Sequence, residues 1–220
     1  MKKLADLRGL RFPDAYVVRM FFKEKLDKTP GRVLELGCGS GNNLLLFDGF
    51  GWDVTGVDID EASLLQAAHN LDIGEEEASG KLLQHDLSSG LPMLQGPFDV
   101  LLAPSSLYYI PRAAARVCLS GARGLLRSGA MVFLRMRLPD DHRAGRGRPL
   151  GRDTWILECQ HTGEMGATNV FWQEHELVEL LHSTLGIEAE SLTLLRVAYE
   201  NVQNGWLVRN SDIVIWGRIP

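Results

Sequence analysis

Residues 33–41 read VLELGCGSG, an apolar run followed by a loop that carries glycine at every second position. Glycine lets a backbone turn sharply and approach a ligand closely, because it has no Cβ atom. The residues after the loop, 42–48, are predicted to form a helix, whose N-terminus offers free N–H groups and a positive dipole end to an anion. We therefore expect a ligand site where a strand over 32–36 enters this loop.

Strands and helices alternate around the loop from residue 32 to residue 138, which predicts an α/β fold with a parallel sheet covered by helices on both faces. The expected strands are 32–36, 52–59, 81–87, 97–104 and 130–138, and the expected helices are 14–28, 42–48, 61–71 and 112–126. Residues 74–80 are expected to form an exposed loop. Ligands of such sheets bind at the C-terminal ends of the strands, where the strand order reverses, and the glycine loop belongs there.

The segment 139–171 interrupts this alternation. Its first half is rich in Pro, Gly, Asp and Arg, and two short strands over 155–160 and 168–172 are predicted to pair as an inserted hairpin. A helix over 173–186 and strands over 190–200 and 211–219 complete the chain. We predict one domain over 1–220, with an N-terminal helical cover over 1–30 and a mobile lid over 139–171.

The composition suits a single globular domain of 220 residues. A net charge of −5 argues against nucleic acid or an anionic membrane as a partner. Cys38, Cys118 and Cys159 lack the spacing of a disulfide framework or a zinc site, so we predict reduced thiols and no metal. The chain start has no apolar run typical of a signal peptide, and no stretch approaches a membrane helix, so a cytoplasmic location is expected.

An acidic residue, Asp58, follows the first glycine of the loop by 21 positions and ends the second expected strand. A carboxylate at this place can accept hydrogen bonds from both hydroxyls of a ribose, which indicates an adenosine-containing cofactor. The dinucleotide-binding pattern needs a further glycine where Asn42 stands, and the chain has no Tyr-x-x-x-Lys pair. A nicotinamide-dependent oxidoreductase is therefore the second hypothesis at this point.

Four segments, taken in order and spacing, resemble the motifs of class I S-adenosylmethionine-dependent methyltransferases: VLELGCGSG (33–41), VTGVDID (54–60), HDL (85–87) and FDVLLAPSSLYYI (98–110). The resemblance implies a Rossmann-like, doubly wound sheet of seven strands, mostly parallel with one antiparallel strand. It also implies S-adenosylmethionine as the cofactor and a methyltransferase activity.

The resemblance further implies the residues that hold the cofactor: Glu35, Gly37, Cys38, Gly39, Gly41, Asp58, Ile59, Asp86, Leu87 and Pro104. In this reading the glycines line the methionine part, and Glu35 supports the loop or reaches the amino group through water. Asp58 holds the ribose. The side chains of Ile59 and Leu87 enclose the adenine ring, whose amino group donates to Asp86.

The methyl acceptor is less well defined by the sequence. The exit of the fourth strand, Ala103-Pro104-Ser105-Ser106, lacks the Asn/Asp-Pro-Pro-Tyr and Pro-Cys motifs of enzymes that methylate nucleic-acid bases or glutamine amides. A small molecule with an oxygen or nitrogen acceptor is therefore expected. The catalytic candidates are Tyr108, Tyr109, Glu158 and His161, and the substrate-binding candidates on the N-terminal helix are Tyr16 and Arg19.

Six arginines lie between residues 135 and 152, against only two aspartates. Arginine forks suit carboxylate or phosphate, so Arg143 and Arg146 are candidates for holding an anionic acceptor, while a solvated loop is the alternative. Two further alternatives stay open. The chain could bind S-adenosylmethionine without turnover, or it could methylate protein or RNA. A monomer and a homodimer are both compatible with the sequence.

Overall fold

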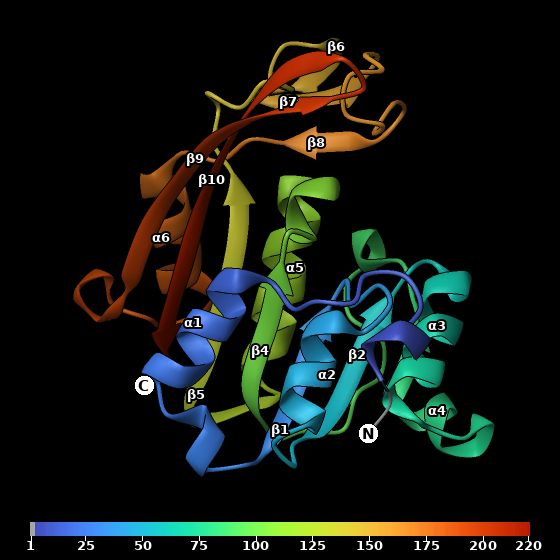
Figure 1. The fold of residues 1–220 in the computed structure, drawn as a ribbon. Helices are drawn as coiled ribbons and strands as arrows, with labels where there is room; N and C mark the ends of the chain where they lie inside the picture. The colour runs from blue at the N-terminus through green and yellow to red at the C-terminus, as the bar shows by residue number, and fades with distance from the viewer. Residues whose placement is uncertain (1–2) are drawn as a thin grey trace.

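The computed structural model describes residues 3–220, with every side chain in that range apart from that of Glu75. Its main sheet has seven strands (Figure 1), which are β1 (Arg32–Leu36), β2 (Asp53–Asp58), β3 (Leu82–Gln84), β4 (Phe98–Pro104), β5 (Leu126–Arg137), β9 (Thr193–Gln203) and β10 (Trp206–Arg218). They are arranged in the order β3-β2-β1-β4-β5-β10-β9. The order reverses between β1 and β4, so the glycine loop after β1 lies at the switch point.

The strand directions confirm the predicted fold class. β1 runs parallel to β2 and β4, and the pairs β2–β3 and β4–β5 are also parallel. β10 is antiparallel to both of its neighbours, β5 and β9. The sheet is therefore mostly parallel with one antiparallel strand.

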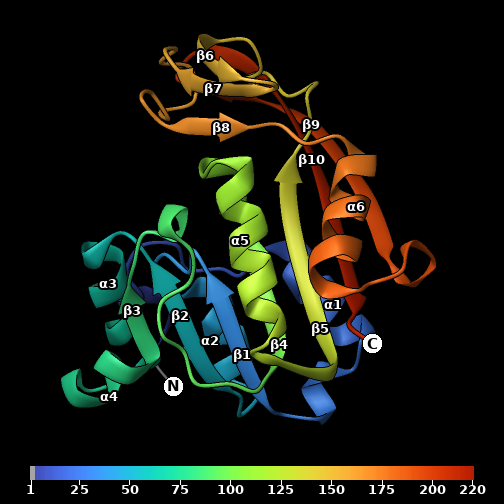
Figure 2. The same ribbon diagram turned by 180° about the vertical axis from the view of Figure 1, so that it is seen from behind.

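Six α-helices cover the sheet on its two faces (Figures 1 and 2): α1 (Ala15–Lys23), α2 (Asn42–Asp48), α3 (Glu61–Leu71), α4 (Glu75–Lys81), α5 (Arg112–Arg123) and α6 (Glu174–Leu185). Local signals start several of them. The Asp14 carboxylate accepts from the Tyr16 N–H before α1, and Gln173 and Glu176 form a capping box before α6.

The core has one apolar cluster on each face of the sheet. Val132 and Leu134 of β5 pack with α5 and α6, whereas Met131 and Phe133 pack with α1 and α2. Side chains of a strand alternate between faces, so the second row continues beyond Phe133 as Arg135 and Arg137. The sheet face thus turns from apolar to charged just beyond the N-terminus of α1.

The insertion forms a second sheet of three antiparallel strands, β6 (Gly147–Gly151), β7 (Thr154–Leu157) and β8 (Thr168–Val170). It lies beyond the C-terminal ends of β4 and β5, next to the projecting ends of β9 and β10 (Figures 1 and 2). The predicted hairpin corresponds to β7 and β8. β6 was not predicted, because its sequence GRPLG has neither apolar alternation nor β-branched residues.

Two local predictions are wrong. The helix expected over 14–28 ends at Lys23, because Lys25 adopts a left-handed conformation and a short 3-10 turn over Leu26–Lys28 follows. The loop expected over 74–80 is instead α4, a polar helix whose sequence EEEASGK lacks an apolar period.

The segment before α1 contacts the glycine loop and the start of α2. The Leu10 N–H donates to Ser40 Oγ at 2.9 Å, and the Asn42 amide donates to the Phe12 carbonyl at 2.9 Å. The first two residues of the predicted cover lie outside the described part of the chain. Within that part, no helix combines the length and the apolar character needed to cross a membrane.

Candidate functional site

The glycine loop is held in a conformation that only glycine adopts easily. The φ angles of Gly37, Gly39 and Gly41 are +74°, +50° and +76°. A Cβ atom on Gly37 would collide with Ser106, and one on Gly41 would lie 3.2 Å from Ala67 Cβ on α3. A Cβ on Gly39 would meet nothing within 4 Å. Gly37 and Gly41 are therefore required by packing, while Gly39 faces open space.

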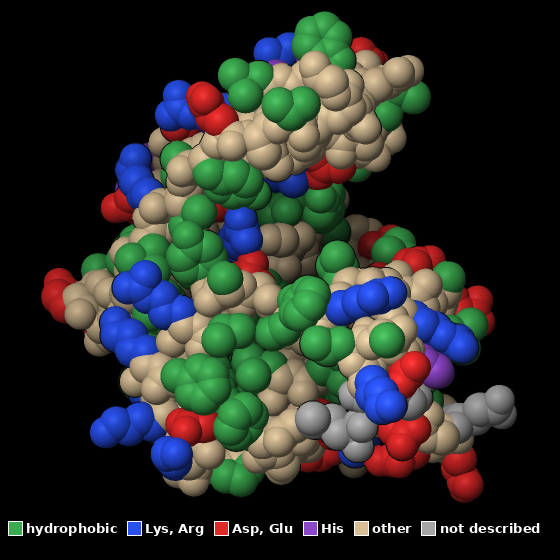
Figure 3. Space-filling view, in the orientation of Figure 1, with side chains coloured by type: hydrophobic (Ala, Val, Ile, Leu, Met, Phe, Trp, Pro, Cys, Tyr) green, Lys and Arg blue, Asp and Glu red, His purple; other side chains and the backbone are tan. Residues whose placement is uncertain are grey.

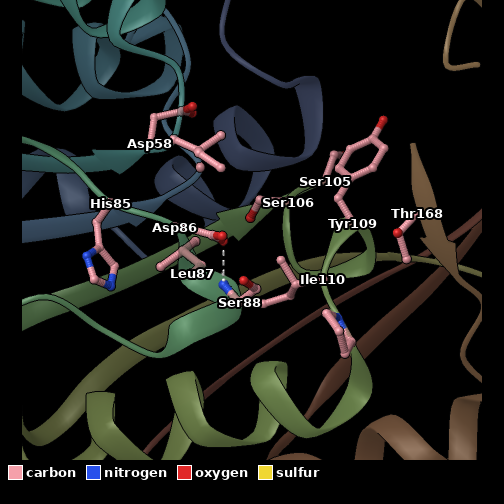
Figure 4. A pocket seen from close by; sticks show the side chains of 13 residues that line it. Asp58, His85, Asp86, Leu87, Ser88, Ser105, Ser106, Tyr109, Ile110 and Thr168 are labelled. Carbon is pink, nitrogen blue, oxygen red and sulfur yellow. Dashed lines mark hydrogen bonds between the residues drawn. The ribbon is translucent and has the colours of Figure 1, made fainter. Parts of the chain in front are cut away.

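Two cavities meet at this loop. The larger, of about 570 Å³, is lined at one end by Asp58, Ile59, Asp86 and Leu87 and at the other by Tyr109 and Thr168 (Figure 4). The smaller, of about 360 Å³, is lined by Phe12, Asp14, Glu35, Gly39, Asn43 and Pro104. Gly37 and Ser105 line both cavities, so the two form one bent cleft along the C-terminal ends of β1 and β4.

One end of the larger cavity is lined by two carboxylates and an exposed apolar side chain. Asp58 accepts from the N–H groups of Gly39 at 2.7 Å and Asp60 at 2.9 Å, and each of its oxygens keeps a second lone pair. Ile59 is 62% exposed, although it is large and apolar. A hydrogen bond from the Ser88 N–H to Asp86, 2.8 Å long, lowers the pKa of that carboxyl. This end can hold a sugar and a flat base.

Glu35 is the buried acid of the smaller cavity. Its side chain is 1% exposed, and Oε1 accepts from the Asn43 amide at 2.7 Å. Oε2 is buried without a hydrogen-bond partner among the described residues. Burial raises the pKa of Glu35 to about 8, with smaller contributions from the charges of Asp58 and Asp14, while the bond from Asn43 opposes the rise. An ammonium group in this cavity would satisfy the unpartnered oxygen.

The N-terminal cover closes the smaller cavity through Asp14. Its N–H donates to Asn43 Oδ1 at 2.8 Å, and its Oδ2 accepts from Arg135 Nη1 at 2.6 Å. Arg135 also donates from Nη2 to Asp212 at 2.6 Å. Asn43 therefore connects the buried Glu35 to the cover, and Arg135 connects the cover to β5 and β10.

The other end of the larger cavity is joined to the insertion. Tyr109, in the short turn η4 (Leu107–Tyr109), donates its hydroxyl to Glu164 at 2.5 Å. Arg137 Nη2 also donates to Glu164, at 2.7 Å, and Arg143 Nε donates to its second oxygen. Burial would raise the pKa of Glu164, but the charge of Arg137 and these hydrogen bonds outweigh it and lower the pKa to about 2. The carboxylate stays ionised and keeps the insertion above the cavity.

The space-filling view shows the same arrangement from outside. The insertion sheet overhangs a hollow in the molecule, and basic and acidic side chains lie at its edges (Figure 3). Because Thr168 of β8 lines the larger cavity, the insertion contributes to the site directly.

Most predicted cofactor residues are brought together by the fold. Those that line the cleft are Glu35, Gly37, Cys38, Gly39, Asp58, Ile59, Asp86, Leu87 and Pro104. Gly41 lines neither cavity and packs against α3. Tyr109 also lines the cleft, while Tyr108 is buried beneath it with ring centroids 4.5 Å apart.

The other predicted substrate and catalytic residues lie outside both cavities. Arg143 is buried and pairs with Asp141 at 3.0 Å as well as with Glu164. Arg146 is exposed and donates to the His142 carbonyl. Two of the remaining residues are on α1: the Tyr16 ring lies 5.8 Å from the Arg135 guanidinium, and Arg19 is exposed. The other two are in the insertion, where His161 stacks on Trp206 and Glu158 is exposed. Their roles stay predictions.

Several residues of the cleft were missed by the sequence reasoning. Asn43 lies two residues after the last glycine of the loop, and Asp14 was predicted only as the first residue of a helix. Ser105 lines both cavities and has a left-handed φ of +64°. The sequence Pro-Ser-Ser does not predict this conformation. Glu164 and Thr168 are distant in sequence from the glycine loop, and no local sequence pattern predicts that they lie near the cleft.

A family model described as a methyltransferase domain matches residues 6–186. Two curated relatives are similar over part of the chain. The 18S rRNA (guanine-N(7))-methyltransferase bud23 of Schizosaccharomyces pombe is 29% identical over 108 residues, 49% of this chain and 38% of that protein. The ubiquinone biosynthesis O-methyltransferase of Dechloromonas aromatica is 31% identical over 137 residues, 60% of this chain and 53% of that protein. The chain thus spans about half or less of the length of these relatives.

Solved structures agree on the fold. A SAM-dependent methyltransferase from Methanosarcina mazei has a TM-score of 0.67 at 18% identity, covering 94% of this chain and 99% of that one. A putative methyltransferase from Bacillus halodurans has a TM-score of 0.64 at 14% identity, covering 94% and 100%. Since the family model also matches well over half of the sequence, the chain belongs to the methyltransferase domain family, with the class I fold of S-adenosylmethionine-dependent methyltransferases.

Proposed function

We propose that this protein transfers a methyl group from S-adenosylmethionine to an oxygen or nitrogen atom of a small molecule. The observation that carries the proposal is the unpartnered Oε2 of the buried Glu35, in a cleft that continues past Gly37 to the Asp58 carboxylate. A cationic amino-acid end at Glu35 and a ribose at Asp58 are the two ends of S-adenosylmethionine.

The other residues of the cleft fit the same donor. Ile59 and Leu87 offer apolar surfaces for adenine, and Asp86 offers an acceptor for its amino group. The open space at Gly39 allows close approach of the methionine part. When bound, the donor supplies a methyl carbon activated by a sulfonium. The contribution of the chain is to hold donor and acceptor in line, an effect worth up to about 7–11 kcal/mol in principle.

A small molecule is favoured over RNA as the acceptor. By their names, one relative acts on 18S rRNA and another on a ubiquinone precursor, so relatives alone do not decide. The cavity of about 570 Å³ lies within the usual range for small-molecule sites. Its roof, formed by the insertion through Thr168 and Glu164, restricts access for a folded RNA. The net charge of −5 also disfavours a polyanion.

An anionic group on the acceptor is not part of the proposal. Arg143 already has two carboxylate partners, Asp141 and Glu164, and Arg146 donates to a backbone carbonyl away from the cleft. A substrate carboxylate or phosphate would have to displace an existing partner of Arg143.

The first test is a calorimetric titration of the purified protein with S-adenosylhomocysteine and, separately, with NADH. Micromolar binding of the first and no binding of the second are expected. Binding of NADH alone would overturn the donor assignment and revive the oxidoreductase hypothesis. Glu35→Gln should lose affinity for S-adenosylhomocysteine. The matched control is Glu190→Gln, because Glu190 is exposed and lines neither cavity.

Turnover separates an enzyme from a non-catalytic binding protein. S-adenosylhomocysteine formation is followed in the presence of a deproteinised metabolite extract. Release above the rate without extract supports methyl transfer. Tight binding without any acceptor-dependent release would favour the non-catalytic alternative.

A further inference from the structure

The cleft contains several titratable side chains, and their positions bear on the chemistry of the acceptor. Those that line the two cavities are Asp14, Glu35, Cys38, Asp58, His85, Asp86 and Tyr109. An acceptor hydroxyl must lose its proton during methyl transfer, so an enzyme acting on an alcohol benefits from a base at the transfer point. The transfer point is expected near Ser105, where the two cavities meet.

The side chains nearest that junction are unsuited to accept a proton. The Tyr109 hydroxyl already donates to Glu164, and burial raises the pKa of Tyr109 far above neutrality. Glu35 is protonated in the free protein near neutral pH, since its pKa is about 8. Burial likewise raises the pKa of Cys38 well above its usual value.

The remaining groups are engaged or lie elsewhere. Both oxygens of Asp14 accept hydrogen bonds, from the Tyr16 N–H and from Arg135. Asp58 and Asp86 belong to the adenosine end of the cavity. His85 lies at that end too, on the far side of the cavity from Tyr109 (Figure 4), with its ring nitrogen 3.2 Å from Ser89 Oγ. No side chain among the described residues is therefore placed to deprotonate an acceptor at Ser105.

The charge of the cleft is one-sided. Among the described residues, no Lys or Arg lines either cavity, whereas Asp14, Asp58 and Asp86 do, together with Glu35, which loses its proton only when a cation binds beside it. Two arginines contact residues of the cleft from behind: Arg135 is shared between the carboxylates of Asp14 and Asp212, and Arg137, 3.4 Å from the Tyr109 hydroxyl, is paired with Glu164. A cleft of this sign favours ligands that carry or develop positive charge, and it repels anions.

Apolar surface at the rim indicates the shape of the ligand. Leu10 and Phe12 line the smaller cavity and are each 68% exposed. Ile110 and Pro111 line the larger cavity beside Tyr109. Flat or aliphatic surface on several sides of the junction suits an aromatic or heterocyclic acceptor.

We infer that the acceptor atom is a nitrogen that is nucleophilic while uncharged, such as a ring nitrogen or a weakly basic amine on an aromatic molecule. The inference rests on the proposed function and narrows its choice between oxygen and nitrogen. The nitrogen lone pair forms the new N–C bond as the S–C bond breaks, and the bonding electrons remain on sulfur. Positive charge passes from sulfur to nitrogen without help from a base, and the acids of the cleft stabilise it there. A nitrogen that carries hydrogen then loses a proton to water.

The deciding experiment identifies the labelled atom. The protein is incubated with S-adenosylmethionine bearing a trideuterated methyl group and a metabolite extract, and the labelled product is characterised by mass spectrometry and NMR. A deuterated methyl group on nitrogen is expected. A label on oxygen would overturn the nitrogen assignment and leave the proposed function intact, whereas a label on sulfur would overturn both. No labelled product, despite binding of S-adenosylhomocysteine, would refute the proposed function and the inference with it.

A binding measurement tests the charge argument without turnover. The complex with S-adenosylhomocysteine is titrated calorimetrically with two probes of the same two-ring skeleton, isoquinoline and 2-naphthoate. Isoquinoline should bind at least about tenfold more tightly. Asp14→Asn should narrow the difference in affinity between the two probes, because it removes a carboxylate and frees Arg135. The control Asp140→Asn, which affects an ion pair with the exposed Arg209, should preserve that difference. Equal or tighter binding of 2-naphthoate by the unmodified protein would contradict the inference.

Discussion

At the scale of single residues, Glu35 shows how one side chain can combine structural and ligand roles. Its Oε1 accepts from Asn43, which in turn accepts from the Asp14 N–H of the cover, so the buried acid takes part in closing the cleft. Its Oε2 has no hydrogen-bond partner among the described residues, and we propose that the ligand supplies one. A buried carboxyl with this arrangement changes its protonation state when a cation binds beside it.

The first prediction concerns that proton. With a pKa of about 8, Glu35 is mostly protonated at pH 7 in the free protein, and an ammonium group beside it lowers the pKa. Binding of S-adenosylhomocysteine at pH 7 should therefore release about 0.9 proton, and affinity should rise with pH up to about 8. Titrations in two buffers of different ionisation enthalpy measure the release. Glu35→Gln should abolish it, and identical heats in both buffers for the unmodified protein would refute the assignment.

The second prediction concerns Asp58. Replacement by Ala removes the hydrogen bonds expected from the ribose hydroxyls and should weaken cofactor binding by about 1.5–3 kcal/mol, the usual value for hydrogen bonds to a charged group. That corresponds to roughly a 10- to 150-fold higher dissociation constant. The control is Asp53→Ala at the opposite end of β2, where the carboxylate pairs with Arg32 and Lys81 on the surface. An unchanged affinity of Asp58→Ala would rule out its proposed role.

At the scale of elements, ion pairs attach the insertion to the sheet, in addition to the apolar packing of Val170 in the main core. Arg137 of β5 and Arg143 of the insertion both donate to Glu164, and Arg143 also pairs with Asp141. Of these two arginines, Arg143 was a candidate for substrate binding on its sequence alone. In the structure they hold Glu164, and through it Tyr109, in place above the cleft.

The third prediction concerns the stability of Arg143 and Arg146 variants, the two arginines that the sequence suggested for binding an anionic acceptor. Arg143→Ala leaves the buried Asp141 without its ion-pair partner, although Glu164 keeps Arg137, and should lower the free energy of unfolding by about 3–5 kcal/mol. Arg146→Ala affects an exposed side chain and should change that free energy by no more than about 0.5 kcal/mol. Urea denaturation measures both. If both variants were fully stable and both lost turnover, the anion-binding interpretation would be favoured instead.

At the scale of the whole molecule, the cleft lies between parts that are contributed by distant regions of the chain. The cover, the glycine loop, the end of β4 and the insertion all border it. A ligand that contacts all of them should bind only to the folded protein, which couples binding to global stability.

The fourth prediction measures that coupling. S-adenosylhomocysteine at about 100 times its dissociation constant should stabilise the folded state by about 2.7 kcal/mol. For a domain of this size the midpoint of thermal unfolding should rise by about 5 to 11 °C. NADH at the same concentration should leave the midpoint unchanged. A rise with NADH and none with S-adenosylhomocysteine would contradict the cofactor proposal.

The fold and the grouping of residues around the glycine loop were largely predictable from the sequence because their signals are local. An apolar strand followed by alternating glycines specifies a tight turn into a helix, and Asp58 ends the next parallel strand, so both must meet at the switch point. The errors also have local causes. The polar helix α4 has no apolar period, and β6 has no alternation.

The sequence by itself therefore determined the α/β fold class, the glycine loop and the acids Glu35 and Asp58 in β1 and β2. The tertiary structure alone decided which groups are already paired. Glu164 lies 55 residues from Tyr109, and Asp14 lies 121 residues from Arg135, yet each pair is in hydrogen-bond contact. Local patterns report backbone conformation and burial, whereas the partner of a charged side chain depends on how distant elements pack. Because Arg137 and Arg143 are paired with Glu164, they attach the insertion above the cleft instead of forming an anion-binding site.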